Sequence, residues 1–393
     1  MTDPSTQPML FTPWTCRDVT LKNRVVIAPM HQYAAEKGYP TDWHLMNVGK
    51  YAVGGAGLVF VESTKVERRG CGTVGDTGLW HDDFIPHFKR LADFIRAHNA
   101  VPGIQLGHSG RKARRFRPWE GRGPLEEASA GVDDWPAWEL VAPSAVAGKG
   151  EGEPVPRALA RDELSGLVER WGAAAARADA AGFDVLEIHS AHGYLLHQFL
   201  SPMSNLRNDD YGGSLENRMR LVIEVVDCVR ANWPDHKPLF LRLSVQDDAG
   251  WGPDESVQLA RIVKARGVDV VDCSSGGMAG GVGMGKTPLD YGYQVPYAEK
   301  LRAEAGVASM AVGLIVHADH AEEILQDGRA DLIALAREVI HNPNWPLDAA
   351  LKLGVDDAYD LMPPAYSYWL SKRAQSMENF EPSTQRARPG AHG

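Results

Sequence analysis

The sequence lacks the features that mark several classes of protein. Its four cysteines are scattered and form no CxxC pair, which argues against a disulfide framework. No apolar run approaches the ~20 residues that a membrane helix needs, and residues 1–8 carry no apolar stretch of a secretory signal. Lys and Arg number 41 against 51 Asp and Glu, so basic surfaces for nucleic acid or anionic membranes are not expected. These absences predict a soluble, cytoplasmic protein with no nucleic-acid or membrane partner.

Short apolar runs alternate with helical patterns between residues 25 and 342. The runs that predict strands are Val25–Ile27, Gly57–Val61, Val101–Leu106, Phe183–His189, Leu239–Leu243, Val268–Cys273, Ala308–Val312 and Leu332–Ala336. The stretches that predict helices are Arg161–Ala181, Ser214–Asn232, Asp254–Arg266, Tyr297–Glu304 and Asp319–Gln326. Strand and helix in repeated alternation indicate parallel strands joined by right-handed crossovers.

The number of units decides between the two main α/β layouts. Eight predicted strands favour a closed (β/α)8 TIM barrel, because an open doubly wound sheet usually has about five or six strands. A dinucleotide-binding open sheet would also carry G-x-G-x-x-G after its first strand. Here Ala28-Pro29-Met30-His31 follows that strand and lacks the motif. The sequence therefore predicts a single barrel domain over residues 9–370.

Three regions depart from the alternation. Residues 9–22 precede the first strand and predict a small hairpin that closes the bottom of the barrel. Residues 107–160, after the third strand, form a long segment rich in Gly and Pro, which predicts a functional lid. The polar residues 371–393 predict a flexible C-terminal tail.

The fourth predicted strand carries the most informative residues. Barrel active sites lie at the C-terminal ends of the strands, and alternation points Glu187 and His189 inward there. His192 and Tyr194 follow in the loop. Two imidazoles can polarise one carbonyl oxygen, and a phenol can supply a proton. The alternatives are a structural histidine, or a metal site of His189, His192 and His197, although no carboxylate or thiolate follows at a familiar ligand spacing.

Other strand ends offer groups that suit a flavin nucleotide. Arg242 stands within an apolar strand and needs an anionic partner, either a reduced flavin or a buried salt bridge. Gln105 could hydrogen-bond the pyrimidine edge of a flavin, although a lone glutamine is uninformative. Gly313 and Arg337 follow the last two strands, where such barrels commonly bind phosphate. A surface location is the alternative for Arg337.

Taken together, these segments resemble the Old Yellow Enzyme family of FMN-dependent ene-reductases, in particular its thermophilic-like bacterial subclass. The resemblance covers about residues 9–370. The matching segments are 21–26, 29–30, 54–58, Gln105, 110–112, 189–202, Asn205, 210–214, 216–218, Arg242, 274–276 and 311–343. The run from His189 through Ser214 is highly specific to the family.

The resemblance implies a role for each residue at the barrel mouth. His189 and His192 would bind the carbonyl or nitro oxygen of a small-molecule activated alkene, and Tyr194 would protonate the neighbouring carbon. Tyr33 would contact the substrate. The residues implied to bind FMN are Pro29, Met30, His31, Ser63, Gln105, Arg242, Gly276, Gly313, Ala336 and Arg337. The reductant would be NADPH or NADH, and flavin N5 would pass its hydride to the alkene.

The sequence departs from the family pattern at three of these positions. His31 stands where the subclass has cysteine and the founding members have threonine, which predicts altered redox tuning of the flavin. Ser63 replaces a small alanine and could add a hydrogen bond to the flavin. Ala336 replaces a glycine and could crowd the phosphate. The departure at His31 motivates an alternative function, a flavin-dependent desaturase or a reductase of an unusual substrate such as an aromatic acyl thioester.

The C-terminal aromatic residues suggest an oligomer. Residues 363–369 resemble the segment that reaches a neighbouring subunit's active site in this subclass. Tyr368 or Trp369 would occupy the space of an arginine found in some members, and ordinary aromatic packing is the alternative. We expect a homodimer or homotetramer. A metal-dependent barrel hydrolase, or a binder without activity, remains the alternative of a different class.

Overall fold

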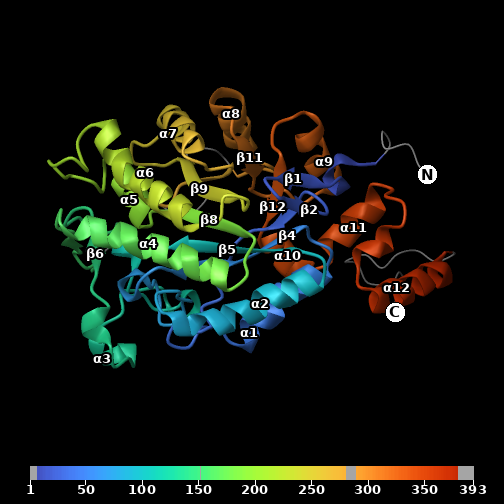
Figure 1. The fold of residues 1–393 in the computed structure, drawn as a ribbon, viewed down its shortest axis with the longest axis horizontal. Helices are drawn as coiled ribbons and strands as arrows, with labels where there is room; N and C mark the ends of the chain where they lie inside the picture. The colour runs from blue at the N-terminus through green and yellow to red at the C-terminus, as the bar shows by residue number, and fades with distance from the viewer. Residues whose placement is uncertain (1–6, 151, 280–288, 379–393) are drawn as a thin grey trace, which may run out of the picture.

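The computed structural model describes residues 7–150, 152–279 and 289–378. Eight parallel strands close into a barrel whose neighbours follow the order β10-β11-β12-β3-β4-β5-β8-β9, and helices surround it (Figure 1). The barrel strands are β3 (Val25–Ile27), β4 (Leu58–Lys65), β5 (Val101–Gly107), β8 (Val185–Ser190), β9 (Leu239–Gln246), β10 (Val270–Ser275), β11 (Ala308–Ala311) and β12 (Leu332–Leu335). The predicted (β/α)8 barrel is confirmed.

The helices lie between the strands along the chain and, for the last three, after the final strand β12. They are α1 (Asp42–Val53), α2 (Ile85–Ala97), α3 (Glu127–Ala130), α4 (Glu163–Ala180), α5 (Leu195–Leu200), α6 (Leu215–Asn232), α7 (Pro253–Ala265), α8 (Val295–Ala305), α9 (Ala318–Gln326), α10 (Arg337–His341), α11 (Trp345–Lys352) and α12 (Pro364–Met377). The five predicted helices correspond to α4 and α6–α9. Helix α1 escapes the prediction because it buries polar His44 and Asn47, which interrupt its apolar pattern.

The bottom of the barrel is closed by the predicted N-terminal hairpin. Strands β1 (Trp14–Cys16) and β2 (Val19–Leu21) pair in antiparallel fashion, with Trp14 opposite Leu21. Leu21 belongs to the apolar cluster inside the barrel, and Trp14 and Val19 pack against that cluster. The hairpin therefore seals the end of the barrel that lies opposite the strand exits.

Side chains fill the barrel in layers that change from apolar to polar. Val185 of β8 lies in the interior cluster with Phe240 of β9 and Val270 of β10. Leu186 and Ile188 lie in the larger cluster between the strands and the helices. This alternation is the one predicted from the sequence, and it sends every second residue of β8 into the barrel.

The next residues along the same inward faces are polar. Glu187, Arg242 and Asp272 stand two residues beyond the apolar layer, and His189 follows two residues later. All four side chains are buried. Because parallel strands end on the same side, this polar content collects at the C-terminal mouth of the barrel.

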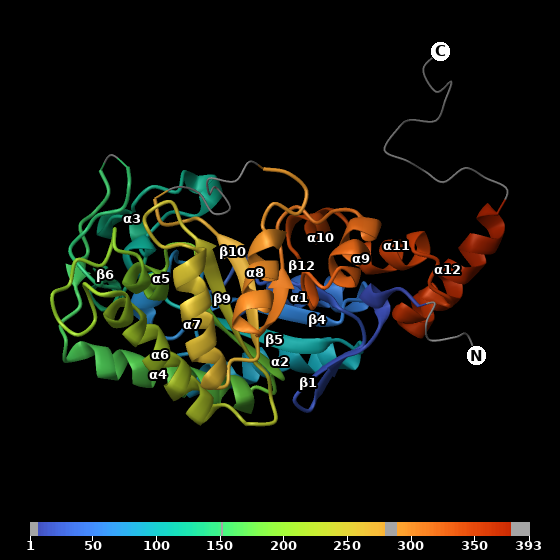
Figure 2. The ribbon, with the colours of Figure 1, turned by 90° about the horizontal axis from the view of Figure 1, so that it is seen from above.

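The segment 107–160 folds over one side of the mouth as the expected lid. It contains α3 and two short parallel strands, β6 (Val141–Ala142) and β7 (Arg157–Ala158). Helix α12 lies at the opposite end of the molecule from α3 and β6 in both views (Figures 1 and 2). Helix α12 continues to Met377, so the first residues of the expected tail are helical, and its flexibility stays a prediction. Residues 379–393 lie outside the described residues.

No helix in the described ranges combines the length and apolar character needed to cross a bilayer.

Candidate active site

A cavity of about 730 Å³ opens at the barrel mouth, between the strand exits and the lid. The sequence-predicted residues that line it are Pro29, Met30, His31, Tyr33, Gln105, His189, His192, Tyr194, Arg242, Ala336 and Arg337. A neighbouring cavity of about 420 Å³ is lined by Gly313 and also by Arg242, Ala336 and Arg337. The shared lining residues place the two cavities side by side, so together they form an elongated site.

Four of the predicted site residues do not line either cavity. Ser63 is buried, and its Oγ accepts a hydrogen bond from Lys65 Nζ at 3.1 Å. Gly276 donates its N–H to Gln246 O behind the site. Tyr368 and Trp369 lie on α12 and are 58% and 70% exposed. Their assignment to the active site of a neighbouring subunit stays a prediction.

His189 and His192 meet edge to face, with ring centroids 5.2 Å apart. His189 Nδ1 accepts the Ala191 N–H at 3.1 Å, and His192 Nε2 lies 2.7 Å from Ser274 Oγ. Burial lowers the pKa of both imidazoles well below the usual value, and nearby positive charges add to this effect. Each ring is therefore neutral near pH 7, with one nitrogen occupied and the other available to donate to a ligand.

The loop that carries His192 requires a glycine at position 193. Gly193 has φ of +71°, and a Cβ there would lie 2.2 Å from Gly277 O. Lys112 Nζ donates to His192 O at 2.7 Å and also to Gly277 O. Burial lowers the pKa of this lysine to about 8. Lys112 thus ties the lid to the histidine loop.

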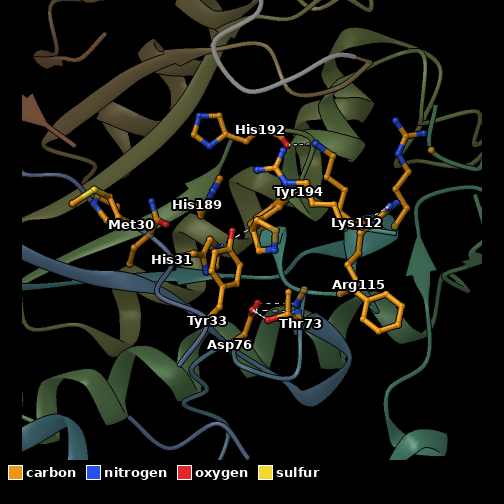
Figure 3. A pocket seen from close by; sticks show the side chains of 18 of the residues that line it. Met30, His31, Tyr33, Thr73, Asp76, Lys112, Arg115, His189, His192 and Tyr194 are labelled. Atoms are coloured by element: carbon orange, nitrogen blue, oxygen red, sulfur yellow. Dashed lines mark hydrogen bonds between the residues drawn. The ribbon is translucent and has the colours of Figure 1, made fainter. Parts of the chain in front are cut away.

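Tyr194 lies beside His189 and beneath the lid. Its ring stacks on His189 with centroids 4.7 Å apart, and Lys65 Nζ lies 4.8 Å from its ring centroid. The phenol oxygen is 3.1 Å from His31 Nε2, and Figure 3 marks this hydrogen bond. Burial raises the pKa of Tyr194 well above its usual value. The phenol is therefore protonated at neutral pH and can act as an acid.

His31 connects Tyr194 to a buried carboxylate. His31 Nδ1 lies 3.3 Å from Glu62 Oε2, and the other carboxylate oxygen lies 2.8 Å from His44 Nε2. Burial by itself would raise the pKa of Glu62, but the two histidines outweigh it and lower that pKa to about 2. His31 also stacks on Tyr33, with ring centroids 5.3 Å apart.

Two buried carboxyl groups, Glu187 and Asp272, contact Gln105 and Arg242, which line the cavity. Gln105 Nε2 donates to Glu187 Oε1 at 2.7 Å, and Arg242 Nη1 lies 3.2 Å from Asp272 Oδ2. Burial raises the pKa of Glu187 well above its usual value, and the Asp272 charge reinforces the shift. Arg242 satisfies both sequence alternatives, because it forms a buried ion pair and also lines the site. Its Nε is buried and finds no hydrogen-bond partner among the described residues.

The smaller cavity resembles an anion cradle. Gly313 has φ of +112°, and a Cβ there would lie 2.8 Å from Gln294 Oε1. Arg337 begins helix α10 and lines the cavity with the preceding Ala336. A helix start beside a guanidinium favours a phosphate group, because backbone N–H groups and a positive charge point the same way.

Sequence reasoning missed Glu62, His44 and Lys65. The second strand was predicted to end at Val61, whereas β4 continues to Lys65. The register against β5 shifts between Val61 and Ser63, so Glu62 is the extra residue of a bulge. The available signal for Glu62 was a glutamate directly after a run of apolar strand residues. A glutamate among apolar strand residues is also what singled out Glu187.

No group of three or more His, Cys, Asp or Glu side chains in the described part of the chain is arranged to hold a metal ion. His197 turns away from His189 and His192. Its Nδ1 accepts the Gly193 N–H at 2.9 Å, and its Nε2 lies 3.4 Å from Asp247 Oδ2. The three histidines of the metal alternative are therefore not brought together around one point.

A family model described as the NADH:flavin oxidoreductase / NADH oxidase family matches residues 9–354. The chain belongs to this family. The NADPH dehydrogenase of a Geobacillus species is 42% identical over 352 residues, which are 88% of this chain and 95% of that relative. This membership confirms a flavin-dependent oxidoreductase and argues against the hydrolase alternative.

Solved structures of NADH:flavin oxidoreductase relatives share the fold. An Old Yellow Enzyme homologue from Zymomonas mobilis superposes with a TM-score of 0.72 at 25% identity, over 92% of this chain and 99% of that one. A complex of 2-naphthoyl-CoA reductase with 2-naphthoyl-CoA gives 0.77 at 25% identity and 89% coverage of this chain. This chain spans about half, 53%, of that reductase. The resemblance to the Old Yellow Enzyme family is confirmed.

FMN is the cofactor of this oxidoreductase family, and the two cavities fit it. A flavin nucleotide is long, planar at one end and dianionic at the other. In the larger cavity, the amide of Gln105 and the Nε of Arg242, which has no hydrogen-bond partner among the described residues, can bind the polar edge of the flavin ring. The smaller cavity offers the cradle of Gly313 and Arg337 for the phosphate.

Proposed function

We propose that this oxidoreductase reduces the activated C=C bond of α,β-unsaturated carbonyl or nitro compounds. The observation that carries the proposal is the meeting of two neutral imidazole donors and one protonated phenol in a single cavity. Bound FMN would supply the hydride that it receives from NADPH or NADH. The side chains of the chain would then stabilise the charge and deliver the proton.

The two histidines would bind the substrate oxygen. His189 has Nε2 free to donate because its Nδ1 accepts a backbone N–H. His192 would donate from Nδ1, with its Nε2 accepting the Ser274 hydroxyl. Negative charge grows on the substrate oxygen as hydride arrives at the β-carbon, so donors aimed at that oxygen lower the barrier.

Tyr194 would complete the reaction by protonating the α-carbon. Its raised pKa keeps the proton on the phenol until a strongly basic carbon is present. Tyr33 stacks on His31 at the edge of the same cavity and is the candidate for packing against the substrate. The lid residues Arg115 and Phe116 line the opposite wall and would limit access of water.

A second candidate is the reduction of an aromatic acyl thioester. The likeness to 2-naphthoyl-CoA reductase motivates it, and so do the lid cations Arg111, Arg115, Arg122 and Lys149 around the cavity. Such cations suit a phosphorylated carrier in a chain whose net charge is −10. An anaerobic panel of simple enones and aromatic acyl thioesters separates the two candidates by their kcat/KM values.

The visible spectrum tests the proposal most directly. The purified protein is expected to be yellow, to bleach with NADPH under anaerobic conditions, and to recolour with 2-cyclohexenone. A colourless protein that stays colourless with added FMN would contradict the cofactor assignment. A protein that bleaches but is not recoloured by any enone or nitroalkene would contradict the ene-reductase proposal.

We further propose a homodimer or homotetramer in which α12 lies against a second copy. Helix α12 buries none of its own residues, and it exposes Tyr366, Tyr368 and Trp369 on one short segment. Light scattering at micromolar concentration is expected to give a multiple of the 42.9 kDa chain mass. A monomer at that concentration would contradict the proposal.

A further inference from the structure

A chain of contacts links Tyr194 to a buried carboxylate through His31. Tyr194 Oη lies 3.1 Å from His31 Nε2, and His31 Nδ1 lies 3.3 Å from Glu62 Oε2. Glu62 Oε2 also accepts the Gln32 N–H at 2.6 Å. In Figure 3, His31 lies between the Tyr33 and Tyr194 side chains at the cavity wall. The proton state of His31 therefore decides what Tyr194 can donate.

The second histidine on Glu62 is neutral. His44 Nδ1 accepts the Thr41 N–H at 2.9 Å, so this nitrogen carries no proton. His44 Nε2 therefore carries the ring proton and donates it to Glu62 Oε1 at 2.8 Å. A neutral ring satisfies the carboxylate as a hydrogen-bond donor but brings no positive charge to it.

Glu62 thus needs another positive group. Its side chain is 1% exposed, and a buried carboxylate without a cation is strongly disfavoured. Across the described ranges, no lysine or arginine lies within ion-pair distance of Glu62, and its two ionic contacts are with His31 and His44. His31 is the partner left to balance the charge.

Glu67, two residues beyond the end of the same strand, provides an internal comparison. It accepts a hydrogen bond from His108 Nε2 at 2.9 Å, and His108 Nδ1 accepts a backbone N–H, as in His44. Two guanidiniums also contact Glu67, namely Arg69 at 2.8 Å and Arg170 at 3.1 Å. Where the histidine is neutral, the fold thus supplies arginines. At Glu62 the place of those arginines is taken by His31.

We propose that His31, held as an imidazolium by Glu62, is a proton relay that returns a proton to Tyr194 in each catalytic cycle. The inference rests on the proposed function, in which Tyr194 is the acid. An imidazolium donates its Nε2–H to the phenol oxygen, which leaves the phenol O–H free to point at the substrate. A neutral His31 with its proton on Nδ1 would instead accept the phenol proton and hold it away from the substrate.

The proton balance closes without any further reactant. The Tyr194 O–H bond breaks as the C–H bond forms at the substrate α-carbon. The phenolate then takes the Nε2 proton of His31, which becomes neutral and keeps its proton on Nδ1, an atom that lies within ion-pair distance of Glu62 without a hydrogen bond to it. Water returns a proton to Nε2 after the product leaves, because the His31 side chain is 16% exposed and lines the cavity.

Other titratable groups face this relay from neighbouring elements. Tyr33 stacks on His31, and His189 stacks on Tyr194. Lys65 lies over the Tyr194 ring, and it pairs with Asp76 at 3.5 Å. Burial raises the pKa values of Tyr33 and Tyr194, and the charge of Glu62 adds to this effect, so the relay is identified by comparing Glu62→Gln with His31→Gln.

The kinetic test follows the reoxidation of NADPH-reduced holoenzyme by 2-cyclohexenone against pH. The wild-type rate is expected to fall at high pH, as His31 loses its proton. Glu62→Gln is expected to move this fall to lower pH by at least about one unit, because the imidazolium loses its counter-charge. His31→Gln is expected to slow reoxidation about tenfold and to abolish the fall. His31→Gln combined with Tyr194→Phe is expected to be no slower than Tyr194→Phe alone.

Matched controls separate the relay from general damage to the fold. Glu67→Gln removes another buried carboxylate that contacts a histidine, just beyond the end of β4, and is expected to leave the pH profile in place. His236→Gln changes an exposed histidine that contributes only a backbone carbonyl. An unshifted profile in Glu62→Gln, or an additive effect of His31→Gln and Tyr194→Phe, would overturn the proposal.

A second readout needs no substrate. In holoenzyme with ¹⁵N-labelled histidine, His31 is expected to show two protonated ring nitrogens at pH 7, with its signals assigned by their loss in His31→Gln. Glu62→Gln is expected to return the ring to the neutral form. A neutral His31 in the wild type would refute the relay. An enzyme that bleaches but is not recoloured by cyclohexenone would count against the proposed function alone, because the nitrogen spectrum reads His31 directly.

Discussion

The histidines at the barrel mouth fall into two groups that differ in what their second nitrogen contacts. On one side, His189 and His192 contact a backbone N–H and a serine hydroxyl. On the other side, His31 contacts the carboxylate of Glu62. Burial holds the pKa values of His189 and His192 well below the usual value and leaves both rings uncharged, whereas His31 lies against a buried carboxylate. The proposed roles of the two groups follow this difference, with substrate binding at one wall and proton transfer at the other.

The largest effect expected from this comparison concerns the neutral pair. His189→Ala is expected to lower the rate of reoxidation by cyclohexenone about 100- to 1,000-fold, the range found when one oxyanion donor is removed. Bleaching by NADPH is expected to slow much less, because no negative charge develops on an oxygen of the nicotinamide as it gives up hydride. Stopped-flow measurement of the two half-reactions checks this. An equal loss in both half-reactions would mean that His189 supports the flavin site rather than the substrate oxygen.

The charged side of the comparison predicts an acid-sensitive contribution to stability. The pKa of Glu62 is lowered from its ordinary 4.5 to about 2, so the ionised form stabilises the fold above pH 4.5. This stabilisation, about 3 kcal/mol, is lost as the pH falls toward 2. The difference in unfolding free energy between wild type and Glu62→Gln is expected to shrink by about 2 kcal/mol from pH 6 to pH 3. Urea titrations at both pH values measure it, and a constant difference would contradict the ionised state of Glu62.

The redox effect of the charged ring is expected to be smaller. His31→Cys removes a positive charge from the flavin side of the cavity and should lower the two-electron midpoint potential of bound FMN by about 30 mV, which is tenfold in the equilibrium constant. Spectroelectrochemical titration of the wild type and the variant checks this. An unchanged potential would end the redox role of His31, while the relay is tested independently by the nitrogen spectrum.

The smallest expected effect on activity concerns the orientation of the His192 ring. Ser274→Ala removes the hydroxyl that His192 Nε2 contacts at 2.7 Å, so the ring can exchange its tautomer. The expected cost is about 1 kcal/mol, or roughly fivefold in kcat/KM for cyclohexenone. Steady-state kinetics measure it. A larger loss, together with loss of FMN, would indicate that Ser274 supports the cofactor instead.

Much of this molecule follows from local patterns in the sequence. Alternating strands and helices predicted the closed barrel, because parallel strands need crossovers and eight of them close on themselves. His189, His192 and Tyr194 were predicted to meet because they follow one strand exit, and all three line the cavity. Arg242 was singled out by its place within an apolar strand, whereas the role of Gln105 followed from the resemblance to the family.

The arrangement around His31 depended on tertiary structure. A bulge in β4 makes Glu62 an extra residue of the strand, and helix α1 brings His44 to it from a different part of the chain. Strand periodicity carries no information about a bulge, and no local pattern states which charge will balance a buried carboxylate. The sequence by itself thus determined the barrel and the pair of histidines that line its mouth. Only the packing of β4 against α1 decided that His31 shares a buried carboxylate, because a charge buried in the interior takes its partner from whichever elements surround it.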